Sequence, residues 1–221
     1  MSVCTATIKI RGVKPLLWHH FGPDAIPLTT REKTGKAGND PSEWQRTVLK
    51  TSKGQLYLEP SYIFGTFRDG AKHTPRKRGS LQPVVAATLQ VADECILVAR
   101  WMPKNIEDLK QAKDEPVYLD VQSVRNPATG ARNIRYRIAA SPGWKAEFTI
   151  LWDNTMVSEE EMQAVLGDAG RFAGLGDGRR IGYGRFEVLQ FNVNGKNNAQ
   201  KPPTAGNLVK NAKKRVATRR S

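Results

Sequence analysis

The sequence predicts an α+β domain with a ferredoxin-like or RRM-type core. In this class, helices cover one face of an antiparallel sheet; here a long loop and a β-hairpin are expected to protrude from it. Segments with strand or helix periodicity follow one another in the order strand, helix, strands, hairpin, strand, helix, strand. The length of 221 residues predicts one domain or two small ones. No stretch approaches the roughly 18–20 consecutive apolar residues of a membrane-spanning helix.

The N-terminal half begins with residues 5–11, whose apolar and polar side chains alternate as in a half-buried strand. Residues 22–54 are rich in Pro, Gly, Thr, Lys and Asp, and they show no sustained periodicity, which predicts a long functional or disordered loop. A strand over residues 56–59 then leads into Pro60, a residue suited to the first turn of a helix. We expect strands over 84–91 and 96–101 and a short surface helix or loop over 103–113.

The C-terminal half contains the strongest hairpin signal, over residues 117–138. Two strand-like segments flank a turn with Asn-Pro and Thr-Gly pairs. A strand is expected over 147–152, and Ser158 with Glu161 forms a capping box that begins a helix. A last strand is expected over 181–191. The apolar face of the helix comprises Met162, Val165, Leu166, Ala169 and Phe172.

The formal charge of +14 makes nucleic acid the leading partner, because phosphate neutralisation releases condensed counterions. Residues 196–221 carry eight basic side chains, no acidic one and few large apolar ones, so they predict a disordered basic tail of charge +8. The domain, residues 1–195, keeps +6. Its basic residues gather in two segments of the sequence: Arg68, Lys72, Arg76, Lys77 and Arg78, and Arg125, Arg132, Arg135 and Arg137.

Five glycines lie within eleven positions between the expected helix and the last strand: Gly174, Gly176, Gly178, Gly182 and Gly184. Glycine permits positive φ and close backbone approach, so such a loop can present N–H groups to a phosphate. Arg179 and Arg180 add positive charge. The alternative is a tight turn in a glycine-containing strand. The Gly-Lys-Ser/Thr ending of a P-loop is missing, and the helix precedes the loop, opposite to a dinucleotide fingerprint.

The run Gly-Leu-Gly-Asp-Gly-Arg-Arg-Ile-Gly-Tyr-Gly-Arg-Phe-Glu-Val, residues 174–188, resembles the C-terminal glycine-rich loop of the RAMP superfamily of CRISPR RNA-binding proteins. Residues 54–68 and 124–148 are similar to the first helix and the "thumb" hairpin of its crRNA-binding backbone subunits. One departure is Ser61 after Pro60, where the family has Gly. The resemblance implies a subunit of a class 1 effector complex that polymerises along a guide RNA. Its implied partners are guide RNA, further copies, other effector subunits and target nucleic acid.

The residues expected to bind RNA are the basic and glycine-loop positions together with two rings. They are Arg68, Lys72, His73, Arg76, Lys77, Arg78, Arg125, Arg132, Arg135, Gly174, Gly176, Arg179, Arg180, Gly182 and Tyr183. Basic side chains suit phosphates, and aromatic rings suit bases. Tyr118, Tyr136 and Trp144 flank the hairpin as further stacking candidates, with core packing as the alternative role.

A nuclease is the alternative function. His19 and His20 follow the first strand, roughly where guide-processing RAMP nucleases carry a catalytic His, and an imidazole can move the proton of a ribose 2′-OH. Asp40, with Asp24 as a competitor, resembles an Asp of target-cleaving type III backbone subunits, although an Asp before Pro is ordinarily a turn residue.

A third possibility is a basic scaffold whose tail alone contacts nucleic acid. Cys4 and Cys95 lack the spacing of metal ligands, and we expect neither a metal nor a cofactor. The first residues lack the basic start and apolar core of a signal peptide. We therefore expect a cytoplasmic protein with no membrane partner.

Overall fold

A computed structural model describes residues 2–22, 40–105, 109, 111–125, 130 and 132–193. The expected tail, the greater part of the expected long loop and the central residues of the hairpin turn lie outside the described residues. Among the described helices, none is both long enough and apolar enough to cross a membrane.

The central element is a six-stranded antiparallel sheet with the main order β11-β1-β10-β7-β3, in which β6 also pairs with β10. β1, α2, β7, β10, α4 and β11 follow the β-α-β-β-α-β order of a ferredoxin-like fold, with β1 and β10 at the centre. The predicted fold class is confirmed. The strands are β1 (Val3–Gly12), β3 (Gln55–Leu58), β6 (Gln90–Val91), β7 (Ile96–Trp101), β10 (Lys145–Asp153) and β11 (Phe186–Val193).

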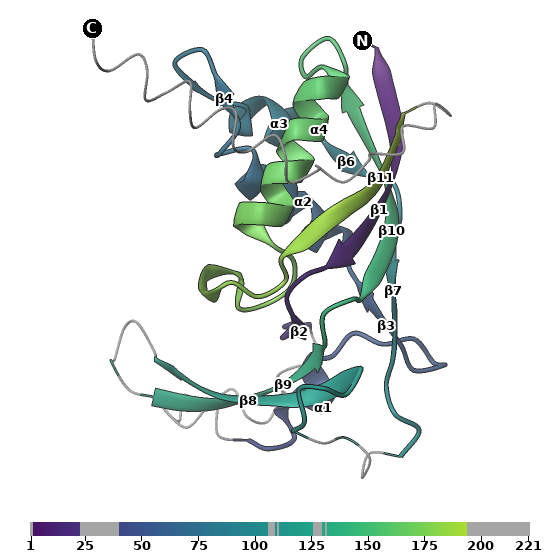
Figure 1. The fold of residues 1–221 in the computed structure, drawn as a ribbon, viewed down its shortest axis with the longest axis vertical. Helices are drawn as coiled ribbons and strands as arrows, with labels where there is room; N and C mark the ends of the chain where they lie inside the picture. The colour runs from purple at the N-terminus through teal and green to yellow at the C-terminus, as the bar shows by residue number, and fades with distance from the viewer. Residues whose placement is uncertain are drawn as a thin grey trace, which may run out of the picture.

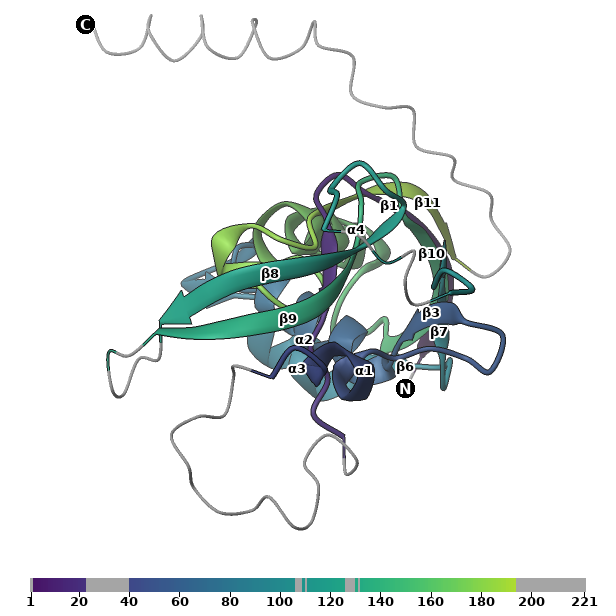
Figure 2. The ribbon, with the colours of Figure 1, turned by 90° about the horizontal axis from the view of Figure 1, so that it is seen from below.

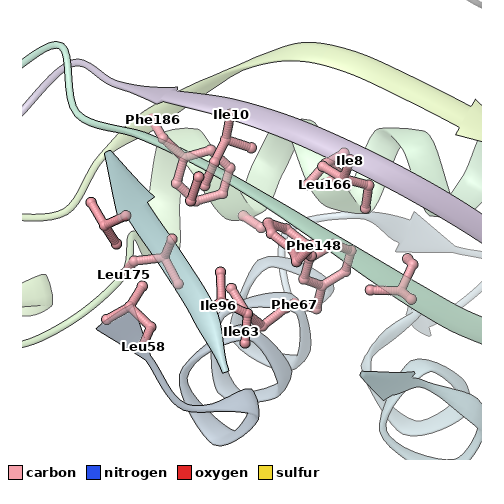
Figure 3. Close-up of a cluster of buried hydrophobic side chains, with 14 of the residues drawn as sticks. Ile8, Ile10, Leu58, Ile63, Phe67, Ile96, Phe148, Leu166, Leu175 and Phe186 are labelled. Atoms are coloured by element: carbon pink, nitrogen blue, oxygen red, sulfur yellow. The ribbon is translucent and has the colours of Figure 1, made fainter. Parts of the chain in front are cut away.

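Three helices cover one face of this sheet (Figure 1): α2 (Pro60–Gly70), α3 (Gln82–Thr88) and α4 (Glu159–Asp168). The alternation in β1 directs Ile8 and Ile10 into the interior, where they are fully buried. Phe148 of β10 meets Phe67 of α2 edge to face, with ring centroids 6.2 Å apart. Figure 3 shows these side chains with others from the sheet and helices in one apolar cluster.

A second sheet of three strands, in the order β2-β9-β8, lies at one end of the body. Its hairpin, β8 (Val117–Arg125) and β9 (Arg132–Ala140), is inserted between β7 and β10 and projects from the body (Figure 2). The pairing runs in continuous register from Val117 opposite Ala140 to Arg125 opposite Arg132. β2 (Leu16–Trp18) pairs with the base of β9, and α1 (Glu43–Thr47) lies beside β9. The expected hairpin is confirmed.

Three sequence predictions about elements need correction. Residues 84–88 belong to α3, not to a strand, and only Gln90–Val91 is extended. Pro83 at the start of α3 and the burial of Val85 against the core favour a helix over the intrinsic strand preference of the two valines. The last strand begins at Phe186, because the glycines before it turn the backbone. The long loop contains α1.

The capping box is present: the Ser158 side chain accepts from the N–H of Glu161, and the Glu161 carboxylate accepts from the N–H of Ser158. The predicted apolar face of this helix is correct for four residues and wrong for Phe172, which is 52% exposed. The last turn, η4 (Ala169–Ala173), is a π-turn closed by a bond from the N–H of Gly174 to the carbonyl of Ala169. This extra residue per turn moves Phe172 off the buried face.

Candidate nucleic-acid interface

The glycine-rich loop between η4 and β11 has a backbone that side-chain-bearing residues rarely adopt. Its five glycines have φ between +68° and +94°. At Gly184, an added Cβ would lie 1.8 Å from the carbonyl oxygen of Leu175, and at Gly176 it would lie 2.5 Å from that of Leu17. The glycines are therefore needed for the path of the loop itself.

The loop is fixed to the body by an apolar anchor and by its own hydrogen bonds. Leu175 is buried in the core (Figure 3), and its N–H donates to the carbonyl of Gly184. The N–H of Gly184 donates to Pro15, and the N–H of Asp177 donates to Leu17. Other loop residues whose N–H donates within the protein are Gly174, Ile181, Gly182 and Tyr183. These N–H groups are not free for a phosphate, so side chains carry the chemistry at these positions.

A hollow of about 210 Å³ separates the glycine loop from the first turns of α2. Its lining residues are Ser61, Tyr62, Gly65, Thr66, Gly176 and Arg179. The hydroxyl of Thr66 donates to the carbonyl of Gly174 at 2.8 Å and holds the two walls together. An added Cβ at Gly65 would meet no atom within 4 Å, so the helix is open to solvent there. Burial raises the pKa of Tyr62 to about 12, which keeps its hydroxyl protonated as a donor.

Three cations surround one carboxylate at the side of this hollow. Asp69 lies 3.1 Å from Lys72, 3.2 Å from Arg179 and 3.3 Å from Arg68. Burial acts against ionisation of Asp69, but the hydrogen bond and charge of Lys72 and the charges of both arginines lower its pKa. We call these four residues the Asp69 cluster. It carries two positive charges in excess, which suits a phosphate backbone.

The glycine loop is also locked to the base of the hairpin. Arg137 of β9, 3% exposed, lies 2.8 Å from Asp120 of β8 and 2.8 Å from Asp177 of the loop. The amide of Gln122 donates to the Tyr183 hydroxyl. Burial raises the pKa of Asp177, but the hydrogen bonds from Arg137 and from the backbone of the loop outweigh it, and the net pKa is lowered. The hairpin and the loop therefore keep a fixed relative position.

Some arginines of the hairpin are held by carboxylates, and others are exposed. Glu43 of α1 is buried, and its carboxylate accepts from the Arg135 guanidinium and, at 3.3 Å, from the backbone N–H of Tyr136. Arg135 thus joins the hairpin to α1. Arg125 and Arg132 are opposite each other at the far end of the strands and are exposed. These two are the hairpin arginines best placed to contact a ligand.

The basic segment from Arg68 to Arg78 does not form one surface. Arg68 and Lys72 belong to the Asp69 cluster, beside the glycine loop. Arg76 lies in a small hairpin of β4 (Pro75–Arg76) and β5 (Gly79–Ser80), where it donates to the carbonyl of Met156 and lies 3.6 Å from Glu161. Figure 1 shows β4 at the end of the body opposite the β8–β9 hairpin. Lys77 and Arg78 are in the same turn as Arg76. Outside this segment, Arg180 of the glycine loop is exposed.

Several aromatic candidates for stacking are buried instead. Tyr118 is 1% exposed and Trp144 is 0% exposed, so both have the alternative role of core packing and are not available to bases. Both fill the interior where the hairpin joins the body. Tyr183 packs against Leu17, Tyr118 and Ala139, and Tyr136 is half-buried against the main core.

The candidate catalytic residues have different surroundings. His19 is nearly buried, and its Nε2 lies 3.1 Å from Glu43. Nδ1 of His20 lies 3.5 Å from the hydroxyl of Tyr62, which lines the hollow. Asp40 accepts from the backbone and hydroxyl of Ser42, and its carboxylate lies 2.6 Å from Arg46.

These hydrogen bonds from Ser42 and Arg46 lower the pKa of Asp40 to about 2 and give it the role of a turn residue before α1. Asp24 lies outside the described residues. Within the described part of the chain, no group of three His, Cys, Asp or Glu side chains is placed to hold a metal ion.

The face of the sheet that the helices leave open differs from an RNA-binding RRM sheet. RRM domains stack bases on aromatic side chains of this face. Here β1 and β10 place Lys9 against Glu147 at 3.4 Å, and β1 pairs Arg11 with Glu187 of β11. Neither central strand carries an aromatic residue at its outward positions. The two central strands therefore lack stacking residues on this face, and an exposed aromatic side chain, Trp101, belongs to the neighbouring strand β7. The cations described above lie on α2, on the glycine loop and on the hairpin.

The α2 residues that line the hollow are not among those expected to bind RNA, although residues 54–68 resemble the first helix of the backbone subunits. One further signal could have found them. Gly65 is a glycine inside a helix, which costs about 1 kcal/mol relative to alanine. A Cβ at this position would meet no neighbouring atom, so close packing does not explain the glycine. An unexplained helical glycine beside a Pro-Ser start indicates a surface where another group approaches closely.

The fold and site define an α+β protein of ferredoxin-like topology with a glycine-loop hollow and a projecting hairpin. Among solved structures, it is similar to a chain of the type III-B Cmr-beta complex bound to cognate target RNA, determined by cryo-EM. The identity is 14% and the TM-score 0.44, over 86% of this chain and 60% of that chain. No family model matches the sequence, and no curated protein matches it.

Proposed function

We propose that this chain is an RNA-binding backbone subunit of a class 1 CRISPR effector complex, and that copies of it polymerise along a guide RNA and present it for target pairing. The observation that carries the proposal is the hollow between α2 and the glycine loop, with Arg179 in its wall and the Asp69 cluster beside it. The resemblance of residues 174–188 to the RAMP glycine loop supports the same conclusion.

The geometry supports RNA binding through the backbone of the nucleic acid. Arg179, Arg68 and Lys72 provide charge beside the hollow, and the protonated hydroxyl of Tyr62 can donate to a phosphate or a ribose. Because the Arg137 lock fixes the hairpin to the loop, Arg125 and Arg132 hold a set position relative to the hollow. Such an arrangement suits binding that is independent of sequence along a single strand.

The test uses the full chain and a fluorescent single-stranded RNA, with affinity measured by anisotropy over a range of salt concentrations. For single strands, the slope of log K against log salt is about −0.7 per neutralised phosphate. Arg179→Ala and Arg132→Ala should each weaken binding and flatten the slope by about 0.7. The matched control is Arg11→Ala, an exposed arginine on the open sheet face. Equal slopes for all the variants and the wild type would contradict the proposal.

Polymerisation has a separate readout. Mass photometry with RNAs of increasing length should show a number of bound copies that rises in proportion to RNA length. A single copy on every RNA would remove the backbone role and leave RNA binding intact.

A second candidate function, a metal-independent endoribonuclease, is favoured by one contact. His20 lies beside the Tyr62 hydroxyl at the hollow, so its imidazole could act on a ribose 2′-OH bound there. Incubation with a hairpin RNA in EDTA, followed by electrophoresis, tests this activity. Cleavage by the wild type and none by His20→Ala would establish it, whereas intact RNA with both would exclude it.

A further inference from the structure

An exposed pair of aromatic rings lies outside the hollow, on the helix side of the molecule. Phe172 of the π-turn is 52% exposed. Its ring centroid lies 5.0 Å from that of His73, with the ring planes inclined by 45°. His73 is also exposed and follows α2, where its N–H donates to the carbonyl of Gly70. We call these two residues the Phe172–His73 surface.

The packing of the π-turn keeps Phe172 on the outside. An added Cβ at Gly70 would lie 2.5 Å from Cα of Ala169, so α2 crosses the turn in direct backbone contact. An added Cβ at Gly170 would lie 2.3 Å from the carbonyl oxygen of Phe186, so β11 is equally close on another side. Ala173, the last residue of the turn, is buried. Small residues occupy the inner positions, and the interior leaves no space for the Phe172 ring.

A basic residue directly precedes each member of the Phe172–His73 surface. Lys72 precedes His73, and the exposed Arg171 precedes Phe172. Through Asp69, Lys72 is in the same cluster as Arg179, which lines the hollow. The aromatic pair therefore continues the cationic surface of the proposed RNA site. An exposed ring among cations suits a nucleotide, whose base stacks while its phosphate meets the charge.

We propose that the Phe172–His73 surface stacks an unpaired base of the single-stranded RNA whose backbone passes the hollow. This inference rests on the proposed RNA-binding function and adds a base contact to it. The contact is with the face of a base, so every base can make it and it carries little sequence preference. In this proposal, the exposed ring of Phe172 is a binding group for RNA.

The experiment compares two labelled RNAs of equal length with the full chain. One is an oligoadenylate, and the other keeps the ribose-phosphate backbone but lacks the bases. Phe172→Ala should weaken binding of the oligoadenylate about tenfold and leave the abasic RNA unchanged. Phe172→Trp, which keeps an aromatic ring, should bind the oligoadenylate with about the affinity of the wild type. The matched control is Trp101→Ala, which removes a ring of similar exposure, 54%, from β7 and should change neither affinity.

The outcomes separate this inference from the function on which it rests. Wild-type affinity of Phe172→Ala for both RNAs would overturn the stacking role, and so would an equal loss for both, which indicates a general distortion. Loss of oligoadenylate binding in Trp101→Ala to the same degree would place the base contact elsewhere and also overturn it. In each of these cases, RNA binding by the wild type that weakens with added salt would still support the proposed function. If the wild type itself binds neither RNA, the proposed function fails first.

Discussion

Replacement of Arg137 by methionine tests the lock between the hairpin and the glycine loop. The Arg137 side chain is 4% exposed and that of Asp120 is 2% exposed, with 2.8 Å between their charged groups. Methionine fills a similar space but leaves the Asp120 carboxylate buried without its partner. Breaking a buried ion pair in this way costs about 3–5 kcal/mol. The Asp177 carboxylate is 40% exposed, so water replaces most of the interaction that it loses when Arg137 is removed.

Urea unfolding followed by tryptophan fluorescence measures this cost, since Trp18 and Trp144 are buried near the junction and become exposed on unfolding. We expect the free energy of unfolding to fall by about 3–5 kcal/mol for Arg137→Met. The control is Arg132→Met on the same strand, whose exposed position predicts a change within about 0.5 kcal/mol.

A second variant separates the ion pair from simple packing. Asp120→Asn removes the buried charge, and its side-chain oxygen can still accept from Gln122, as Asp120 does at 2.9 Å. The double variant Arg137→Met/Asp120→Asn should therefore regain a large part of the lost stability. A loss below about 1 kcal/mol for Arg137→Met, or a double variant no more stable than the single one, would refute the reasoning.

Three further predictions concern the loop, α4 and α1. Gly184→Ala should lower the free energy of unfolding by about 2–5 kcal/mol, because its Cβ would clash with Leu175, and Gly182→Ala, with open space, by only about 1–2 kcal/mol. Equal losses in urea unfolding would contradict this. Ser158→Ala should cost about 1 kcal/mol by the same measurement, and no loss would show that the capping box is dispensable. The Asp40 pKa is lowered from 3.8 to about 2, so its contribution to stability is full above about pH 4 and lost as pH falls through about 2. The difference in unfolding midpoint between wild type and Asp40→Asn should vanish over this range, and a constant difference would contradict the assignment.

The elements that the sequence predicted well are those where local chemistry and tertiary packing agree. The alternation of residues 5–11 is retained in β1, because one face of that strand is buried and the other is open. The Ser158 capping box forms because it needs only four consecutive residues. The hairpin follows from alternation on both sides of a turn sequence.

The failures arise where distant contacts decide. Val84 and Val85 favour strands, but burial of Val85 against the core and the start at Pro83 make α3 a helix. Phe172 has the correct spacing for burial, yet close contacts of α2 and β11 with the small residues before it impose a π-turn. Neither contact is visible in the local sequence.

The candidate site was predictable only in part, because contacts between residues distant in the sequence also decide its structure. Positive φ at the glycines follows from their residue type, but the use of the loop N–H groups within the protein depends on Pro15 and Leu17, which are distant in sequence. Arg68 and Arg76 are close in the sequence, and the turn after α2 carries Arg76 away to α4. Charge clusters in a sequence therefore indicate a partner class more reliably than they define a surface.

The central claim is that RNA lies on the helix side of the body, along the glycine loop and hairpin. Photo-crosslinking of a 4-thiouridine RNA to the full chain, followed by peptide mapping, tests this most directly. We predict adducts within residues 61–73, 171–183 and 125–135, and none on the open sheet face formed by β1 and β10. Adducts confined to residues 196–221, or to that sheet face, would contradict the claim.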